Sequence, residues 1–144
     1  MRNKTISKNI RLVLDILEDE VKGNVTSALS KLSPKYKMTW MYRARQGELF
    51  PRIGPGITKK ELSEAYKITG RNYDIRHIGE GRGGIVMLEL IETYPAPKGS
   101  QMYRTPLVLV LELRAGKIVS GRHYCDPRIS RQRISIEKID DALN

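Results

Sequence analysis

The order of its periodic segments constrains the fold of this chain more than any other feature. Apolar residues recur at helical spacing over 5–21, and a second short helical stretch ends before Pro34. From about residue 72 onward, four apolar segments of strand length follow one another, separated by turn sequences. Early helices followed by consecutive strands are not typical of an alternating βαβ architecture. The sequence therefore predicts the α+β class.

The late strands are expected to pair as an antiparallel meander. Two further elements come before it: a strand over 36–46, and a helix over 59–69 that begins with capping-box spacing. A strongly twisted sheet of this kind, with the N-terminal helices packed on its concave face, forms a cone that encloses a cavity. The strands of the meander are predicted over 72–79, 85–93, 101–114 and 117–125.

Length and cysteine content limit the organisation of the chain. Its 144 residues fit one domain, 1–144, with a C-terminal tail over 128–144 in which 135–143 reads as a short helix. The only cysteine, Cys125, cannot form an internal disulfide, so we expect the protein to be located in the reducing cytoplasm. No stretch approaches the roughly 18 apolar residues of a membrane span.

The chain is strongly basic, with a formal net charge of +10. Such a charge suits anionic partners, including nucleic acid. Because lysine and arginine are spread along the sequence, a solvated basic surface is favoured over a nucleic-acid site. Two histidines and one cysteine show no metal-ligand spacing, and we expect neither a metal nor a cofactor.

Strand alternation predicts which side chains face the cavity. In 117–125, the alternate positions that include Gly121 and His123 are smaller and less charged than the others, so they are placed inside. In 85–93, Glu89 marks the odd positions as outer, which turns Glu92 inward. The predicted inner polar set is Tyr42, His77, Glu92 and His123, and the predicted substrate-binding residues are Trp40, His77, Leu88, Leu90 and Leu109.

A carboxylate beside an imidazole in an apolar cavity suits acid–base catalysis. Glu92 or His123 is expected to act as the base, and Tyr42 as a hydrogen-bond donor to a developing oxyanion. Each residue also has a structural interpretation. An inward histidine is usually a hydrogen-bonded core residue, Glu92 can lie in solvent at the mouth of the cone, and Tyr42 can be a rim tyrosine.

The segment 107–126 resembles the closing hairpin of the polyketide-cyclase-like branch of the nuclear-transport-factor-2-like superfamily. Those proteins often end in a Gly-Lys/Arg-Ile turn followed by an aromatic–x–Asp element, which corresponds here to 116–118 and 124–126. The first helix and the Met41-Tyr42 strand are similar too. This resemblance implies a cone fold and a homodimer paired across the outer sheet faces. An apolar outer stripe suits such pairing; it consists of Ile85, Met87 and Ile91.

Within that superfamily, the limonene epoxide hydrolases are the most similar in pattern. Their pocket holds an Asp–Arg–Asp set, with a tyrosine and an asparagine that bind the attacking water. One aspartate corresponds to Glu92, the second to His123 and the tyrosine to Tyr42. The arginine position is occupied by Leu90 and the asparagine position by Ala44. The resemblance therefore implies a related pocket without the complete hydrolase set.

Two classes of function follow. The first is a small-molecule enzyme of the isomerase, cyclase or hydrolase type, acting by acid–base chemistry on a mostly hydrophobic substrate. The alternative is a non-catalytic domain of the same fold that binds a small apolar ligand or another protein. Turnover of a bound compound distinguishes the first from the second.

Overall fold

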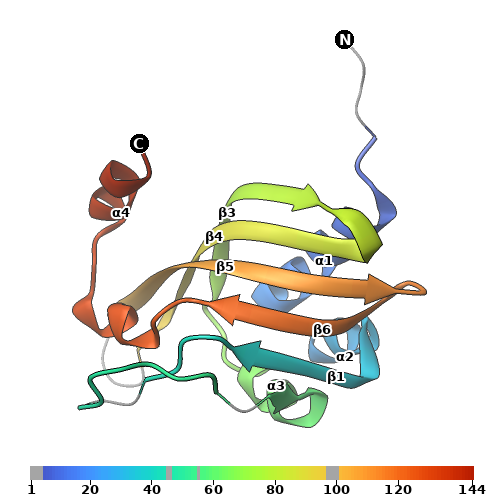
Figure 1. Cartoon of the computed structure of the whole chain (residues 1–144), viewed down its shortest axis with the longest axis horizontal. Coiled ribbons are helices and arrows are strands. Elements are labelled where there is room, and N and C mark those ends of the chain that lie inside the picture. Colours follow the sequence, from blue (N-terminus) through green and yellow to red (C-terminus); the bar gives the residue numbers. More distant parts are fainter. Residues whose placement is uncertain (1–4, 45–46, 55, 97–100) are drawn as a thin grey trace.

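A six-stranded curved sheet dominates the structure, a computed structural model that describes residues 5–44, 47–54, 56–96 and 101–144. The strands lie in the order β2-β1-β6-β5-β4-β3 (Figure 1). The elements are α1 (Lys8–Lys22), α2 (Val25–Ser30), β1 (Leu32–Trp40), β2 (Ile57–Thr58), α3 (Lys59–Tyr66), β3 (Asn72–Glu80), η1 (Arg82–Gly84), β4 (Ile85–Pro95), β5 (Met102–Arg114), β6 (Lys117–Tyr124), η2 (Pro127–Gln132) and α4 (Ile136–Leu143).

The predicted meander is confirmed, since β3, β4, β5 and β6 pair antiparallel in chain order. The prediction of an antiparallel sheet is wrong at one place. Strand β1 pairs with β6 in parallel, so the sheet is mixed. Most of the chain lies between these two strands, so no short hairpin joins them. A long connection of this kind allows two strands to pair in parallel.

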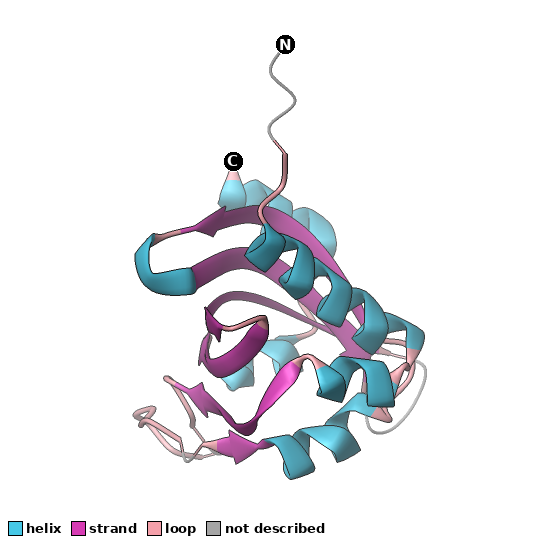
Figure 2. Ribbon diagram, turned by 90° about the vertical axis from the view of Figure 1, so that its right-hand side faces the viewer, coloured by secondary structure: helices cyan, strands magenta, loops and turns pink. Residues whose placement is uncertain are grey.

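The first helix covers the concave side of the sheet, as predicted (Figure 2). Ser7 caps its N-terminus by accepting a hydrogen bond from the Ile10 backbone N–H, and Gly23 ends it in the left-handed conformation, with φ of 73°. Its inward face buries Val13, Ile16, Leu17 and Glu20. The helix thus supplies one wall of the space inside the cone.

Helix α3 begins at the predicted capping box, in which the side chains of Thr58 and Glu61 bond each other's backbone N–H groups. It ends at Tyr66, three residues earlier than predicted. Leu62 and Tyr66 are buried on its inner side. Among the described residues, no helix is both long and apolar enough to cross a bilayer.

The C-terminal tail packs against the sheet instead of extending from it. Ile139 of α4 is 4% exposed, and Arg76 of β3 donates a hydrogen bond to Asp140 at 2.5 Å. Arg76 also pairs with Asp74, which lies directly opposite Ile91 across β3 and β4. These contacts join α4 to β3 beside Ile91, which is only 1% exposed. Ile91 is therefore buried by its own chain, and its predicted role in an exposed outer stripe is wrong.

Candidate functional site

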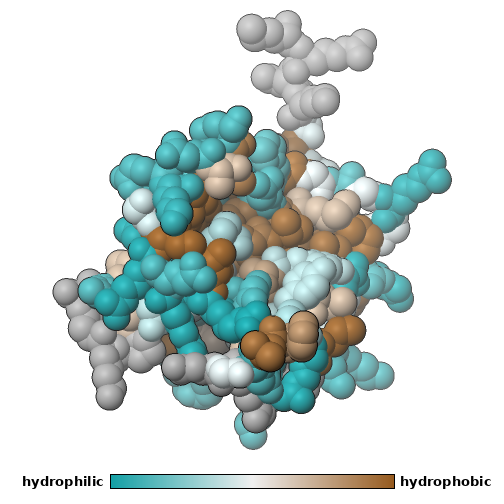
Figure 3. Space-filling view, turned by 60° about the vertical axis from the view of Figure 1, so that its left-hand side comes forward, coloured by the Kyte–Doolittle hydropathy of each residue, from teal (hydrophilic) through white to brown (hydrophobic). Residues whose placement is uncertain are grey.

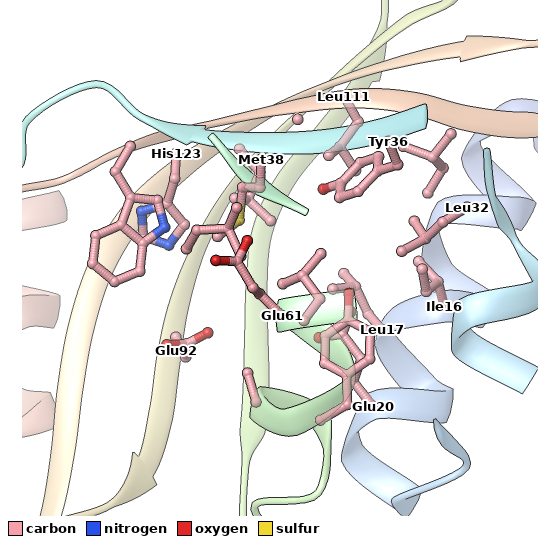
Figure 4. Close-up of a pocket in the computed structure, with 18 of the residues that line it drawn as sticks. Ile16, Leu17, Glu20, Leu32, Tyr36, Met38, Glu61, Glu92, Leu111 and His123 are labelled. Carbon is pink, nitrogen blue, oxygen red and sulfur yellow. The ribbon is translucent and has the colours of Figure 1, made fainter. Parts of the chain in front are cut away.

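A cavity of about 510 Å³ lies between the concave face of the sheet and helices α1 and α3 (Figure 4). Most of its lining is apolar and includes Ile16, Leu17, Leu62, Leu107, Leu109 and Leu111. Gly121 gives this lining its shape: a Cβ there would lie 2.6 Å from the Tyr36 hydroxyl, so only glycine leaves room for that ring. The volume suits a small organic molecule.

Four polar side chains form a cluster within this apolar lining. Glu20 points inward from α1, and the Tyr73 hydroxyl donates a hydrogen bond to its Oε2 at 2.5 Å. Arg71, just before β3, donates from Nη1 to the Tyr73 hydroxyl at 3.3 Å and lies 4.0 Å from the same Oε2. Glu92 of β4 completes the cluster, since it lines the cavity directly opposite Tyr73 in the pairing of β3 with β4. The cavity therefore holds two carboxyl groups beside one phenol and one guanidinium.

Burial dominates the protonation of this cluster. It raises the pKa of Glu20 to about 7, against the opposing effect of hydrogen bonds from Tyr73 and Tyr66 and of the charge on Arg71. Burial also raises the pKa of Glu92, and Arg71 and Tyr73 oppose that rise. One guanidinium balances one carboxylate, so a second ionised carboxylate is unfavourable here. The Glu20–Glu92 pair therefore tends to keep one proton near neutral pH.

His123 lies at the same end of the cavity as Glu92 (Figure 4). Its ring lies beside Trp40, with centroids 5.8 Å apart, and its Nδ1 is 3.3 Å from the Cys125 sulfur. Burial, helped by Arg71, lowers the pKa of His123 to about 4, so the ring is neutral at pH 7. Burial raises the pKa of Cys125 to about 12, which keeps that thiol protonated.

Four of the predicted site residues line the cavity together: Trp40, Glu92, Leu109 and His123. Leu88 and Leu90 point into the concave side as expected, and each is only 1% exposed. They belong to the packed core, however, and are absent from the cavity lining, so they support the wall from behind.

Tyr42 and His77 lie outside the cavity, and strand irregularities explain both corrections. Strand β1 ends at Trp40, so alternation does not continue to Tyr42, which is 48% exposed and packs edge-on against Tyr124. The register of β3 against β4 shifts between Ile75 and His77. This bulge turns His77 outward, where its side chain is 81% exposed and bonds Glu89 at 3.1 Å.

Three members of the polar cluster were not among the predicted site residues. Glu20 had a recognisable signal, because it falls at helical spacing after Ile16 on the apolar face of the first helix. Tyr73 lies on the inner face of its strand, where a tyrosine also suits a core position. Arg71 precedes the strand and had no sequence signal at all. Among the described residues, no three His, Cys, Asp or Glu side chains are arranged to hold a metal ion.

Several solved structures share this architecture at low sequence identity. A nuclear-transport-factor-2-like protein from Cytophaga hutchinsonii is 18% identical, with a TM-score of 0.63 over 87% of this chain and 96% of its own. An epoxide hydrolase of the limonene-epoxide-hydrolase-like type from M. tuberculosis is 16% identical, with a TM-score of 0.67 over 94% and 95%. A protein from Catenulispora acidiphila with a ketosteroid-isomerase-like fold, solved with trimethylamine, is 12% identical, with a TM-score of 0.67 over 85% and 90%.

The sequence matches no protein-family model, and no curated protein shows significant similarity to it. At these identities the structural neighbours show the fold alone. The chain therefore has the nuclear-transport-factor-2-like, ketosteroid-isomerase-like fold, as the resemblance implied. Leu90 occupies the arginine position of the hydrolase pattern, and the guanidinium near the carboxyl groups of this cavity is that of Arg71, directly before β3.

Proposed function

We propose that this protein is a small-molecule enzyme that transfers protons on a mostly apolar substrate bound inside the cone. One observation carries the proposal: two carboxyl groups, buried Glu20 and half-buried Glu92, line the same mostly apolar cavity, with Arg71 beside them. A structural role alone does not require two acids inside such a cavity, because each costs free energy when ionised there. Pairs of carboxyl groups held in different protonation states are typical of acid–base catalysis.

In this proposal Glu92, in its ionised form, accepts a proton from the substrate or from an attacking water. Glu20, in its protonated form, returns a proton at the other end of the pair. In this state Tyr73 connects them, because its hydroxyl accepts a hydrogen bond from the protonated Glu20 and donates one to the ionised Glu92; the 2.5 Å contact between Tyr73 and Glu20 allows either direction. Burial raises the pKa of Tyr73 well above its usual value, so the phenol remains a donor throughout.

Isomerisation, cyclisation and water addition all require such proton transfers. The epoxide hydrolase among the structural neighbours supports the third of these for a protein of this fold. His123 is neutral at pH 7 and serves as a hydrogen-bonding wall, while the base role falls to the carboxylate. The predicted donor Tyr42 lies outside the cavity, and Tyr73 takes its place in the proposal.

A non-catalytic interaction domain is the second candidate, and one observation favours it. Three large apolar side chains are 65–83% exposed in the segment after β1: Leu49, Phe50 and Ile53. This segment lies at the cavity, because Arg52 pairs through its backbone with Arg43, which is part of the lining. Such side chains suit contact with a partner or with a large ligand.

A thermal-shift screen followed by product analysis tests the first candidate. The probes are apolar ketones, epoxides, steroids and fatty acids, with short oligonucleotides to test the basic surface. We expect an apolar compound to raise the melting temperature of the wild type but not of Ala65→Phe, which fills the cavity. Chromatography with mass detection then shows whether that compound is converted.

For a converted compound, Glu92→Gln should lower kcat at least about 100-fold. Glu89→Gln is the matched control, because Glu89 lies on the same strand with its side chain outside the cavity. We also expect kcat/KM to fall as the pH rises above about 7, where the pair loses its shared proton. Full activity of Glu92→Gln, or a bound compound recovered unchanged from the whole panel, would refute the enzymatic proposal.

A further inference from the structure

A small recess of about 60 Å³ adjoins the main cavity at the Glu92 end. It shares three walls with that cavity: Trp40, Glu92 and His123. Pro127 and Ser130 of η2 line its other side, and Ser130 is only 4% exposed. The tail therefore closes one end of the cone, and the recess is a side chamber of the proposed active site.

Two buried polar atoms without a hydrogen-bond partner belong to residues that line this one recess. They are Trp40 Nε1 and Thr105 Oγ1; the third such atom in the described part of the chain is Arg71 Nε. Thr105 is 4% exposed and lies directly opposite Glu92 in the pairing of β4 with β5. Buried polar atoms are nearly always satisfied in native proteins, so two unsatisfied atoms at one recess indicate that something else occupies it.

The indole N–H can only donate a hydrogen bond, while the threonine hydroxyl can donate or accept. Their common partner is therefore an atom that accepts, such as an oxygen. The indole is held in place by its neighbours. His123 lies beside the ring, and the Arg43 guanidinium lies over the face of the indole, 5.4 Å from the ring centroid, in a cation–π contact. A donor fixed in this way binds an acceptor with little loss of conformational freedom.

We propose that the recess is a subsite for a hydrogen-bond-accepting oxygen of the ligand, bound by Trp40 Nε1 and Thr105 Oγ1. This inference rests on the proposed function, and it narrows the substrate class to mostly apolar compounds that carry a carbonyl, ether or epoxide oxygen. At about 60 Å³, the recess admits one such group and excludes a ring. The oxygen then lies beside Glu92, with the apolar body in the main cavity.

The test compares 2-tetralone with tetralin, which have the same bicyclic skeleton with and without a carbonyl oxygen. Calorimetric titration gives the Kd of each compound for the wild type, Trp40→Phe, Thr105→Val and Thr105→Ser. We expect the ketone to bind the wild type at least about fivefold more tightly than tetralin, the ratio that one hydrogen bond contributes. Trp40→Phe and Thr105→Val should abolish or reduce that ratio, and Thr105→Ser, which keeps the hydroxyl, should preserve it.

The outcomes separate this inference from the proposed function. Equal binding of both compounds to the wild type would overturn the oxygen subsite and leave the apolar cavity standing. Binding of neither compound would count against both. If the recess instead holds a permanent water, Thr105→Val should change the melting temperature of the free protein and leave the ketone preference intact, which also overturns the subsite. Cooperative melting of each variant verifies that it is folded.

Discussion

Glu20 shows at the scale of one residue what a buried carboxyl group costs this molecule in stability. It occupies the apolar face of α1, where an aliphatic residue would pack without cost, and only 8% of it is exposed. Its carboxyl group is satisfied by Tyr73 and approached by Arg71, so the position is specifically built for an acid. A buried acid that the fold tolerates in this way is the reason that Glu20 enters the proposed proton transfer.

We predict that Glu20→Gln stabilises the protein at high pH. The folded-state pKa of about 7 lies above the ordinary glutamate pKa of 4.5, so the native state binds more protons than the unfolded state between these values. The free energy of unfolding therefore falls as the pH rises through this window and levels off above it. Glutamine removes that penalty, which amounts to about 3 kcal/mol above pH 8.

Urea unfolding of the wild type and of Glu20→Gln at pH 5 and pH 8 measures the effect. Glu64→Gln, which removes an exposed carboxylate from α3, is the control for the loss of one charge. The gain in stability should be confined to Glu20→Gln and to pH 8. An equal gain at both pH values would mean that the folded-state carboxyl group of Glu20 does not change its protonation between pH 5 and pH 8, and it would contradict the prediction.

At the scale of elements, strand irregularities decide which side chains reach the cavity. By alternation with Gly121 and His123, Val119 is predicted to face inward as well. The register of β5 against β6 shifts between Glu112 and Leu113, and Ile118 lines the cavity in place of Val119. Beyond it, Gly121 and His123 line the cavity as predicted. The bulge before His77 has the opposite effect and removes a predicted site residue. One inserted residue is enough to reverse the face of every later side chain.

Docking of α4 on the sheet gives a prediction at the same scale. Ile139→Ala should lower the free energy of unfolding by about 2–4 kcal/mol, because its side chain is buried between α4 and the sheet. Leu143→Ala, at a position that is 42% exposed on the same helix, should change it by less than about 0.5 kcal/mol. Equal, small effects of both substitutions in chemical unfolding would show that α4 does not stay on the sheet in solution.

At the scale of the whole molecule, the surface is mainly hydrophilic, with apolar side chains exposed among the polar ones (Figure 3). On the outer side of the sheet, the tail covers Ile91, while Met87 and Val108 remain 49% and 37% exposed on neighbouring strands. The homodimer that the family resemblance implies remains a prediction. Its interface would now centre on these two residues instead of the longer stripe.

Sedimentation velocity tests that interface. We predict that the wild type sediments as a dimer, and that Met87→Glu and Val108→Glu each sediment as a monomer, because a charge on a shared apolar face opposes association. Ile68→Glu, which changes an equally exposed residue beyond α3, should leave the dimer intact. A monomeric wild type, or variants that remain dimeric, would refute pairing through this face.

The sequence alone was enough to predict the order of elements, the α+β class, the capping box of α3 and the antiparallel meander. These features depend on local periodicity and turn chemistry, which short segments carry on their own. It also placed Glu92, His123, Trp40 and Leu109 at the cavity, because strand alternation holds wherever a strand is regular.

Only the tertiary structure decided the rest. It excluded Tyr42 and His77, where a strand end and a bulge interrupt the alternation, and it paired β1 with β6 in parallel. It also brought Arg71 to Glu20 across 51 residues of sequence and opposed Thr105 to Glu92. Contacts between distant segments depend on the register and curvature of the whole sheet, and no local pattern in the sequence encodes them.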